Sequence, residues 1–181
     1  MNKFNIIDIE CTCWRGDPPN GQRAEIIEVG IVSLDLEKDR FLTASSHLVR
    51  PSKSEVSKYC EDLTGITSEM LREEGLQFAN VLQALQALCE IHKRPWGSWG
   101  KFDYEKLREE GLKRNVMDAV PKEHYNIKKL DQEEAELTET KSLQTAMNRR
   151  NISRTMGGKH RALSDALGAA QIFREVWNVN K

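Results

Sequence analysis

Hydrophobic positions in the first fifty residues follow the pattern of β-strands. An apolar run rich in β-branched residues predicts a buried strand over about residues 4–10, and a longer run predicts a second over 25–34. A third strand is expected over about 40–49, where Pro51 ends it. The short connections between the three runs predict an antiparallel meander.

The pattern then changes to helical periodicity interrupted by short aromatic segments. Two apolar stripes with helical spacing stand out. The first consists of Leu76, Val81, Leu82, Leu85, Leu88 and Cys89. The second, in the final helix, consists of Leu163, Leu167, Ala170, Phe173 and Trp177, with Gly157 and Gly158 in the loop before it. We interpret both stripes as core-facing.

Shorter elements fill the region between these stripes. Strands are expected at 95–99 and at 125–127, and helices at about 104–114, 129–137 and 142–150. Strands first, followed by strands that alternate with helices, predict an α/β fold in which helices flank a sheet. With no internal repeat and no linker, we expect a single domain over residues 1–181.

Asp8 and Glu10 interrupt the apolar run of the first predicted strand. Side chains two residues apart on a strand project from the same face, so both carboxylates are expected to converge. Burial and mutual repulsion both disfavour two unpaired anions in a sheet. A divalent cation removes this cost, and carboxylate oxygens suit Mg²⁺ or Mn²⁺. The pair therefore indicates a metal site, with a strand end that bears two solvated acids as the alternative.

Composition limits the class of protein. A hydrophobic fraction of 39% and a charged fraction of 30% are typical of a soluble globular chain. No apolar run approaches the roughly 20 residues of a membrane helix. Asp8 and Glu10 lie inside the one segment that could resemble a secretory signal. We therefore expect a cytoplasmic protein with no membrane partner. Its four cysteines lack a paired zinc spacing and are expected to be reduced.

Charge is unevenly distributed along the chain. The net charge of −1 neither supports nor excludes binding to nucleic acid, but residues 141–181 carry eight Lys or Arg against two acids. Such a basic segment would attract phosphates, and a solvated helical surface is the alternative. The candidate phosphate contacts are Arg149, Arg150, Arg154, Lys159 and Arg161.

Three further residues could take part in chemistry with the first two acids. Asp103 follows the strand predicted at 95–99 and opens a helix, at the kind of crossing where α/β sheets place ligands. A simple helix cap is the alternative. Asp165 lies at the start of the final helix, where the helix dipole favours an acid in any case. His160 precedes it by five residues in a glycine-led loop, rather than on an apolar face.

The ordered combination of these residues is more specific than each residue alone. The chain resembles the DEDDh branch of the DEDD exonucleases over nearly its whole length. The resemblance rests on Asp8-Ile9-Glu10, Phe102-Asp103-Tyr104 and His160-x4-Asp165, in that order. It implies a ribonuclease H-like α/β fold with a central five-stranded mixed sheet flanked by helices.

Other segments are similar to one subgroup, the 3′-exonucleases related to the histone-mRNA and enhanced-RNA-interference enzymes. These segments are Asp8 to Trp14, Glu25 to Glu28, Val49-Arg50-Pro51, Leu63 to Thr67 and Gly97-Ser98-Trp99. One departure concerns the substrate path. Many relatives have an Asn a few residues before the third acid, and this chain has Ser98, Gly100 and Lys101 there.

The resemblance implies a two-metal 3′–5′ exonuclease. The catalytic residues would be His160, Asp8, Glu10, Asp103 and Asp165. The four acids would hold two divalent cations, Mg²⁺ or Mn²⁺, which stabilise the attacking and leaving oxygens at phosphorus. His160 would act as the general base, since an imidazole titrates near neutral pH. The reaction would release nucleoside 5′-monophosphates from single-stranded RNA or DNA 3′ ends, with RNA favoured.

The same resemblance indicates residues for the terminal nucleotide. The backbone of Cys11 and Thr12 would approach it, while Leu63 and Ile66 would pack on its base and Trp99 is a further stacking candidate. Two alternatives of another class are a nucleic-acid-binding module without catalysis and an interaction protein with an incidental acidic strand. Loss of a ligand or of the histidine would favour the first, and the second leaves the ordered five residues unexplained.

Overall fold

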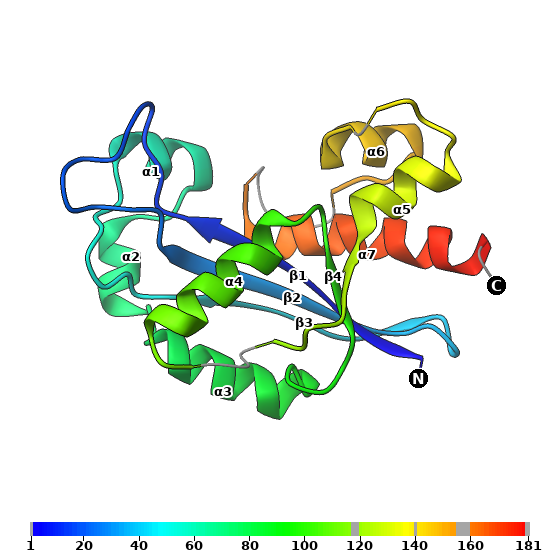
Figure 1. Cartoon of the computed structure of the whole chain (residues 1–181), viewed down its shortest axis with the longest axis horizontal. Coiled ribbons are helices and arrows are strands. Elements are labelled where there is room, and N and C mark those ends of the chain that lie inside the picture. Colours follow the sequence, from blue (N-terminus) through cyan, green and yellow to red (C-terminus); the bar gives the residue numbers. More distant parts are fainter. Residues whose placement is uncertain (1, 117–119, 140, 155–159, 180–181) are drawn as a thin grey trace.

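Three long antiparallel strands and two short parallel strands form the central sheet (Figure 1). The computed structural model describes residues 2–116, 120–139, 141–154 and 160–179. The meander consists of β1 (Lys3–Cys11), β2 (Ile26–Asp35) and β3 (Arg40–Leu48). β4 (Trp96–Ser98) pairs parallel to β1, and β5 (His124–Asn126) pairs parallel to β4. The order is β3-β2-β1-β4-β5, which confirms the expected mixed five-stranded sheet.

Alternating residues of β1 build a hydrophobic core on each face of the sheet. Phe4 and Ile6 pack in one core with α5 (Ile127–Glu134), α6 (Leu143–Arg149) and α7 (Ala162–Val179). Ile7 and Ile9 point to the other core, which α3 (Phe78–Cys89) and α4 (Phe102–Lys113) cover. Figure 1 shows α7, the last helix, lying along the strands that begin the chain.

Two short helices, α1 (Lys58–Thr64) and α2 (Ser68–Glu73), were not among the expected elements. Each is too short to show a periodic stripe, but each has a side-chain cap. Ser57 accepts a hydrogen bond from the Cys60 backbone, and Thr67 accepts one from Met70. These caps were the available sequence signal.

Two residues of the first predicted stripe do not belong to the core. α3 begins at Phe78, so Leu76 precedes it and forms a β-bridge with Val49 instead, and Leu88 is exposed on the helix. The stripe of the last helix is confirmed, but Gly157, Gly158 and Lys159 lie outside the described residues. None of the helices within the described part of the chain is both long and apolar enough to cross a membrane.

Candidate active site

At the carboxyl end of β1, one face of the strand changes from apolar to acidic. The alternation that points Phe4 and Ile6 toward α7 continues to Asp8 and Glu10. Asp8 pairs with Gly30 of β2, and Glu10 pairs with Glu28. Both acids are partly buried, so the strand holds two carboxylates at the edge of a dry core.

A glycine on β2 allows α7 to reach these acids. Gly30 lies directly under the start of α7, where a Cβ atom would overlap the backbone of Ala162 and Leu163. Because Gly30 is the cross-strand partner of Asp8, the first turn of α7 lies beside Asp8. This turn carries Asp165. Close packing of helix on strand therefore brings the first and last acids of the set together.

Glu28 anchors the same end of α7. Its buried carboxylate accepts hydrogen bonds from the Ala162 backbone at 2.9 Å, the Arg161 guanidinium at 2.7 Å and the Ser46 hydroxyl at 2.6 Å. Burial opposes the ionisation of Glu28, but the hydrogen bonds from Arg161, Ser46 and Ala162 outweigh it and lower its pKa. Glu28 thus caps a helix from a neighbouring strand. The sequence alone indicated Glu28 only as part of a segment that is similar to the exonuclease subgroup, and did not predict this capping role.

Asp103 reaches β1 from the opposite core. It lies in the first turn of α4, and its Oδ1 accepts a hydrogen bond from the Ile9 backbone at 3.2 Å. Burial raises the pKa of Asp103 to about 6, against the lowering effect of backbone hydrogen bonds and the Ser98 hydroxyl. The Ser98 hydroxyl also lies 2.9 Å from Nε2 of His124. Ser98, in the stretch where the sequence departs from many relatives, thus supports the third acid.

Mutual repulsion among the acids shows that they share one site. Burial, followed by the charges of Asp103 and Asp165, raises the pKa of Asp8 well above its ordinary value. Burial and then the charges of Asp165 and Glu28 raise the pKa of Glu10 to about 8. A divalent cation would reverse both effects, because it stabilises the ionised form of every carboxylate. This all-oxygen set of carboxylates therefore fits a hard cation such as Mg²⁺ or Mn²⁺.

His160 joins the acids from the residue before Arg161. Ligand atoms of Glu10, His160 and Asp165 all lie within 4.8 Å of one another. His160 is exposed and has a left-handed backbone conformation, with φ of 58°. Its imidazole therefore faces solvent beside the carboxylates, where it can accept a proton or contact a cation. The structure brings all five predicted catalytic residues into this one region.

The residues predicted to contact the terminal nucleotide are more widely distributed. Cys11 ends β1 and is partly buried, and Thr12 is fully buried. The Thr12 hydroxyl donates to the Arg23 carbonyl at 3.1 Å and accepts from the Glu25 backbone at 3.0 Å. The Thr12 side chain is therefore committed to the loop that precedes β2.

The apolar candidates differ in exposure. Leu63 of α1 and Trp99 after β4 are partly buried, and Trp99 packs against the core under α7. Ile66 is fully buried in a cluster with Cys60 and Leu71, so its side chain is part of the support for α1 and α2. A residue that we did not predict is Phe102, which is 58% exposed directly before Asp103. The sequence feature that could have indicated Phe102 is its position as an aromatic residue directly before the candidate metal ligand Asp103.

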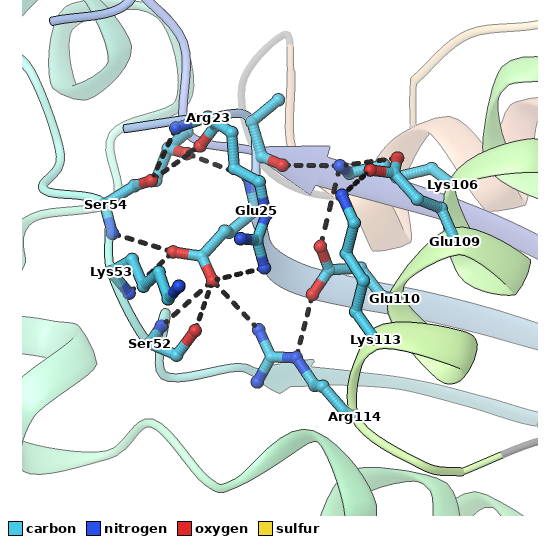
Figure 2. A network of polar contacts seen from close by, with 12 residues as sticks. Arg23, Glu25, Ser52, Lys53, Ser54, Lys106, Glu109, Glu110, Lys113 and Arg114 are labelled. Atoms are coloured by element: carbon cyan, nitrogen blue, oxygen red, sulfur yellow. Dashed lines mark hydrogen bonds and ion pairs between the residues drawn. The ribbon is translucent and has the colours of Figure 1, made fainter. Parts of the chain in front are cut away.

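A buried charge network connects α4, the helix that carries Asp103, to the residues just before β2. Figure 2 shows the side chains of this network. Glu25 is its centre. The Glu25 carboxylate accepts hydrogen bonds from the backbones of Lys53 and Ser54 at 2.8 and 2.7 Å and from the Ser52 hydroxyl at 2.5 Å. Arg114, which caps the carboxyl end of α4, lies 3.6 Å from the same carboxylate. The network thus connects α4 to a loop more than fifty residues away in sequence.

A second set of charges in the network contacts the loop between β1 and β2. Lys106 of α4 donates to the Ala24 carbonyl and forms ion pairs with Glu109 at 3.0 Å and Glu110 at 3.6 Å. Arg114 closes the network with a 2.8 Å ion pair to Glu110. Charges on one face of α4 are therefore paired within the protein rather than offered to a ligand.

The basic carboxyl-terminal segment also pairs largely with acids of the chain. Arg149 and Arg150 both bond to Asp131 of α5, at 2.6 and 2.9 Å. Arg161 is held by Glu28, as described above. These side chains therefore have structural partners, and the alternative of an ordinary helical surface gains support for Arg149 and Arg150.

Comparison with known proteins shows the family to which the chain belongs. A sequence model of the exonuclease (RNase T) family matches residues 6–173, which include all five candidate catalytic residues. The chain belongs to this exonuclease family. Among curated proteins, no sequence matches it.

Solved structures place the exonuclease in the DEDDh type. The nuclease domain of 3′hExo, a DEDDh family member bound to rAMP, has 25% identity and a TM-score of 0.84, covering 98% of this chain and 92% of that one. A 3′-exonuclease that recognises the histone mRNA stem-loop has 26% identity and a TM-score of 0.84, covering 98% and 82%. E. coli Exonuclease I bound to dT13 shares the fold at 14% identity and a TM-score of 0.73, covering 97% and 41%.

Proposed function

We propose that this exonuclease degrades single-stranded nucleic acid from its 3′ end, with RNA preferred to DNA, and releases nucleoside 5′-monophosphates. The observation that carries the proposal is the convergence of Asp8, Glu10, Asp103 and Asp165 with His160, from β1, α4 and the start of α7. The preference for RNA is supported by relatives solved with rAMP and with the histone mRNA stem-loop.

The four acids would hold two divalent cations, Mg²⁺ or Mn²⁺. When bound, these cations would activate the attacking water and stabilise the negative charge that develops at the scissile phosphate. Without a cation, burial and repulsion keep the pKa of Asp8 and of Glu10 high. A bound cation would favour the ionised form of both carboxylates.

His160 would take the proton from the attacking water. Its exposed imidazole lies beside Glu10 and Asp165 and directly precedes Arg161, which Glu28 holds at the start of α7. This anchoring holds the imidazole close to the carboxylates, which a general base needs in order to act at the reacting atom. The proton would then pass to solvent.

The terminal nucleotide would lie between the end of β1 and the start of α4. We propose the backbone of Cys11 and Thr12 on one side, with Leu63 and Trp99 presenting their accessible surface to the base. Ile66, fully buried with Cys60 and Leu71, would support the segment of α1 and α2 rather than contact the base directly. Phe102, exposed beside Asp103, would add an aromatic surface for stacking.

The test is a time course on 5′-labelled single-stranded RNA and on the DNA strand of the same sequence. Each is incubated with Mg²⁺, with Mn²⁺ or with a chelator, and Asp8→Ala serves as the matched variant. We expect a ladder that shortens by one nucleotide from the 3′ end, faster on RNA and absent with chelator or Asp8→Ala. Binding without cleavage by the metal-loaded wild type would instead support a non-catalytic binding module.

A further inference from the structure

One candidate cation ligand already has a positive partner within the chain. Nη1 of Arg154 forms an ion pair with Oδ1 of Asp165. The same nitrogen donates to the Ser164 hydroxyl at 3.2 Å, and Nε donates to Gln144 Oε1 at 2.9 Å. Arg154 and Asp165 have side chains that are 17% and 15% exposed. The guanidinium is therefore held from both sides over the first turn of α7.

This contact sets Arg154 apart from the other basic residues near the site. Arg161 is directed to Glu28, which is outside the candidate ligand set. Across residues 2–116, 120–139, 141–154 and 160–179, Arg154 alone forms a salt bridge with Asp8, Glu10, Asp103 or Asp165. Its partner Asp165 belongs to the group of ligand atoms that also includes Glu10 and His160.

A guanidinium and a divalent cation compete for the same carboxylate. The bond from Arg154 Nη1 uses a lone pair of Asp165 Oδ1, and the positive charge of the guanidinium repels an approaching cation. In the protein without a bound cation, the same positive charge balances the negative charge of Asp165. Only molecules in which Arg154 has left Asp165 can bind the cation fully. The apparent affinity for the cation is therefore reduced in proportion to the fraction of such molecules.

We propose that Arg154 is the internal counter-ion of the metal-free site and that a divalent cation must displace it from Asp165. The chain therefore lowers its own metal affinity through Arg154. The inference rests on the proposed metal site, because it requires that Asp165 bind a cation.

Calorimetric titration of Mn²⁺ into chelator-treated protein tests this competition. For Arg154→Gln we expect Mn²⁺ binding about twofold to fivefold tighter than wild type, the range that corresponds to losing one ion pair near the protein surface. The matched control is Arg149→Gln, which removes the same charge from a residue paired with Asp131. Its Mn²⁺ affinity should equal that of the wild type.

A charge-neutral variant separates displacement from simple repulsion. Gln144→Ala removes the acceptor that holds Nε of Arg154 and leaves every charge in place. It should tighten Mn²⁺ binding in the same direction, by less than Arg154→Gln. Thermal unfolding adds a second readout, because Arg154→Gln should be less stable than wild type in chelator and gain more stability from Mn²⁺.

Other results of these experiments would contradict the inference. Weaker Mn²⁺ binding by Arg154→Gln would make Arg154 a support of the bound state, and equal tightening by Arg149→Gln would assign the effect to net charge. Either result overturns the inference while the metal site stands. If the folded wild type binds no Mn²⁺, the proposed metal site fails, and the inference fails with it.

Discussion

His160 is the residue whose role at the site is most sharply testable. If it acts as a general base, His160→Ala should lower the rate of hydrolysis by about 10²–10⁴-fold and leave Mn²⁺ affinity unchanged. Rates from the RNA time course and affinities from calorimetry check both parts. His92→Ala, an exposed histidine after α3, is the control and should keep the wild-type rate. A collapse of Mn²⁺ affinity in His160→Ala would instead make His160 a ligand.

Gly30 determines how closely α7 approaches β1. In Gly30→Ala the new Cβ would overlap backbone atoms of Ala162 and Leu163, which cannot move away as a flexible side chain would. We expect a loss of about 2–3 kcal/mol in the free energy of unfolding, within the range for overpacking, and weaker Mn²⁺ binding.

The control for this variant is Gly16→Ala. A Cβ at Gly16 meets no atom within 4 Å, so unfolding and metal binding should match the wild type. Chemical denaturation measures both variants. Wild-type stability and metal affinity in Gly30→Ala would show that α7 does not depend on this close approach.

Among the elements, α7 depends on a helix cap that comes from another strand. Glu28→Ala removes the acceptor shared by the Ala162 backbone, the Arg161 guanidinium and the Ser46 hydroxyl. We expect the free energy of unfolding to fall by about 2–3 kcal/mol, near the lower end for breaking a buried pair, because Arg161 is 34% exposed and can be rehydrated.

The Asp39–Arg174 pair, farther along α7, provides the matched control. Asp39 is 62% exposed, so Asp39→Asn should cost less than about 1 kcal/mol. Denaturant titration at neutral pH compares the two variants. An equal loss in both would show that Glu28 acts as an ordinary surface ion pair.

The elements that repeat a pattern over many residues could be predicted from the sequence. Period-two alternation on β1 placed Asp8 and Glu10 on one face, and helical spacing located α7. α1 and α2 could not be predicted by periodicity, because they contain too few turns.

Contacts between elements that are distant in sequence also could not be predicted from the pattern of hydrophobic and polar residues. Nothing local distinguishes Gly30 from another strand glycine, since its role depends on a helix more than 130 residues later. Likewise, Arg154 was predicted as a phosphate contact from its charge, while the structure pairs it with Asp165. The ordered acids could be predicted because their spacing and sequence context are specific, but their partners depend on tertiary packing.

At the scale of the whole molecule, the Glu25 network makes the free energy of unfolding depend on pH in the acidic range. Burial opposes ionisation, but hydrogen bonds from Ser52, Lys53 and Ser54 outweigh it and lower the pKa of Glu25 to about 2, from an ordinary 4.5. A lowered carboxyl pKa stabilises the folded state above the unfolded pKa, and this contribution disappears as pH falls toward the folded pKa.

Glu25→Gln tests this linkage. The variant should be less stable than wild type at pH 7, and the difference should shrink as pH falls from about 4.5 to about 2. Unfolding free energies measured across this range check the prediction. A difference that stays constant with pH would show that the ionisation of Glu25 does not contribute.

The packing of α7 onto β1 and β2 also has a kinetic consequence. The carboxylates come from residues 8, 10, 103 and 165, and the bond from Ala162 to Glu28 spans 134 residues. Contacts this distant in sequence form slowly, because the intervening chain loses much entropy when the loop closes. During refolding, the β1–β3 meander can therefore form early while the protein is still inactive. Nuclease activity should return only with the docking of the last helix.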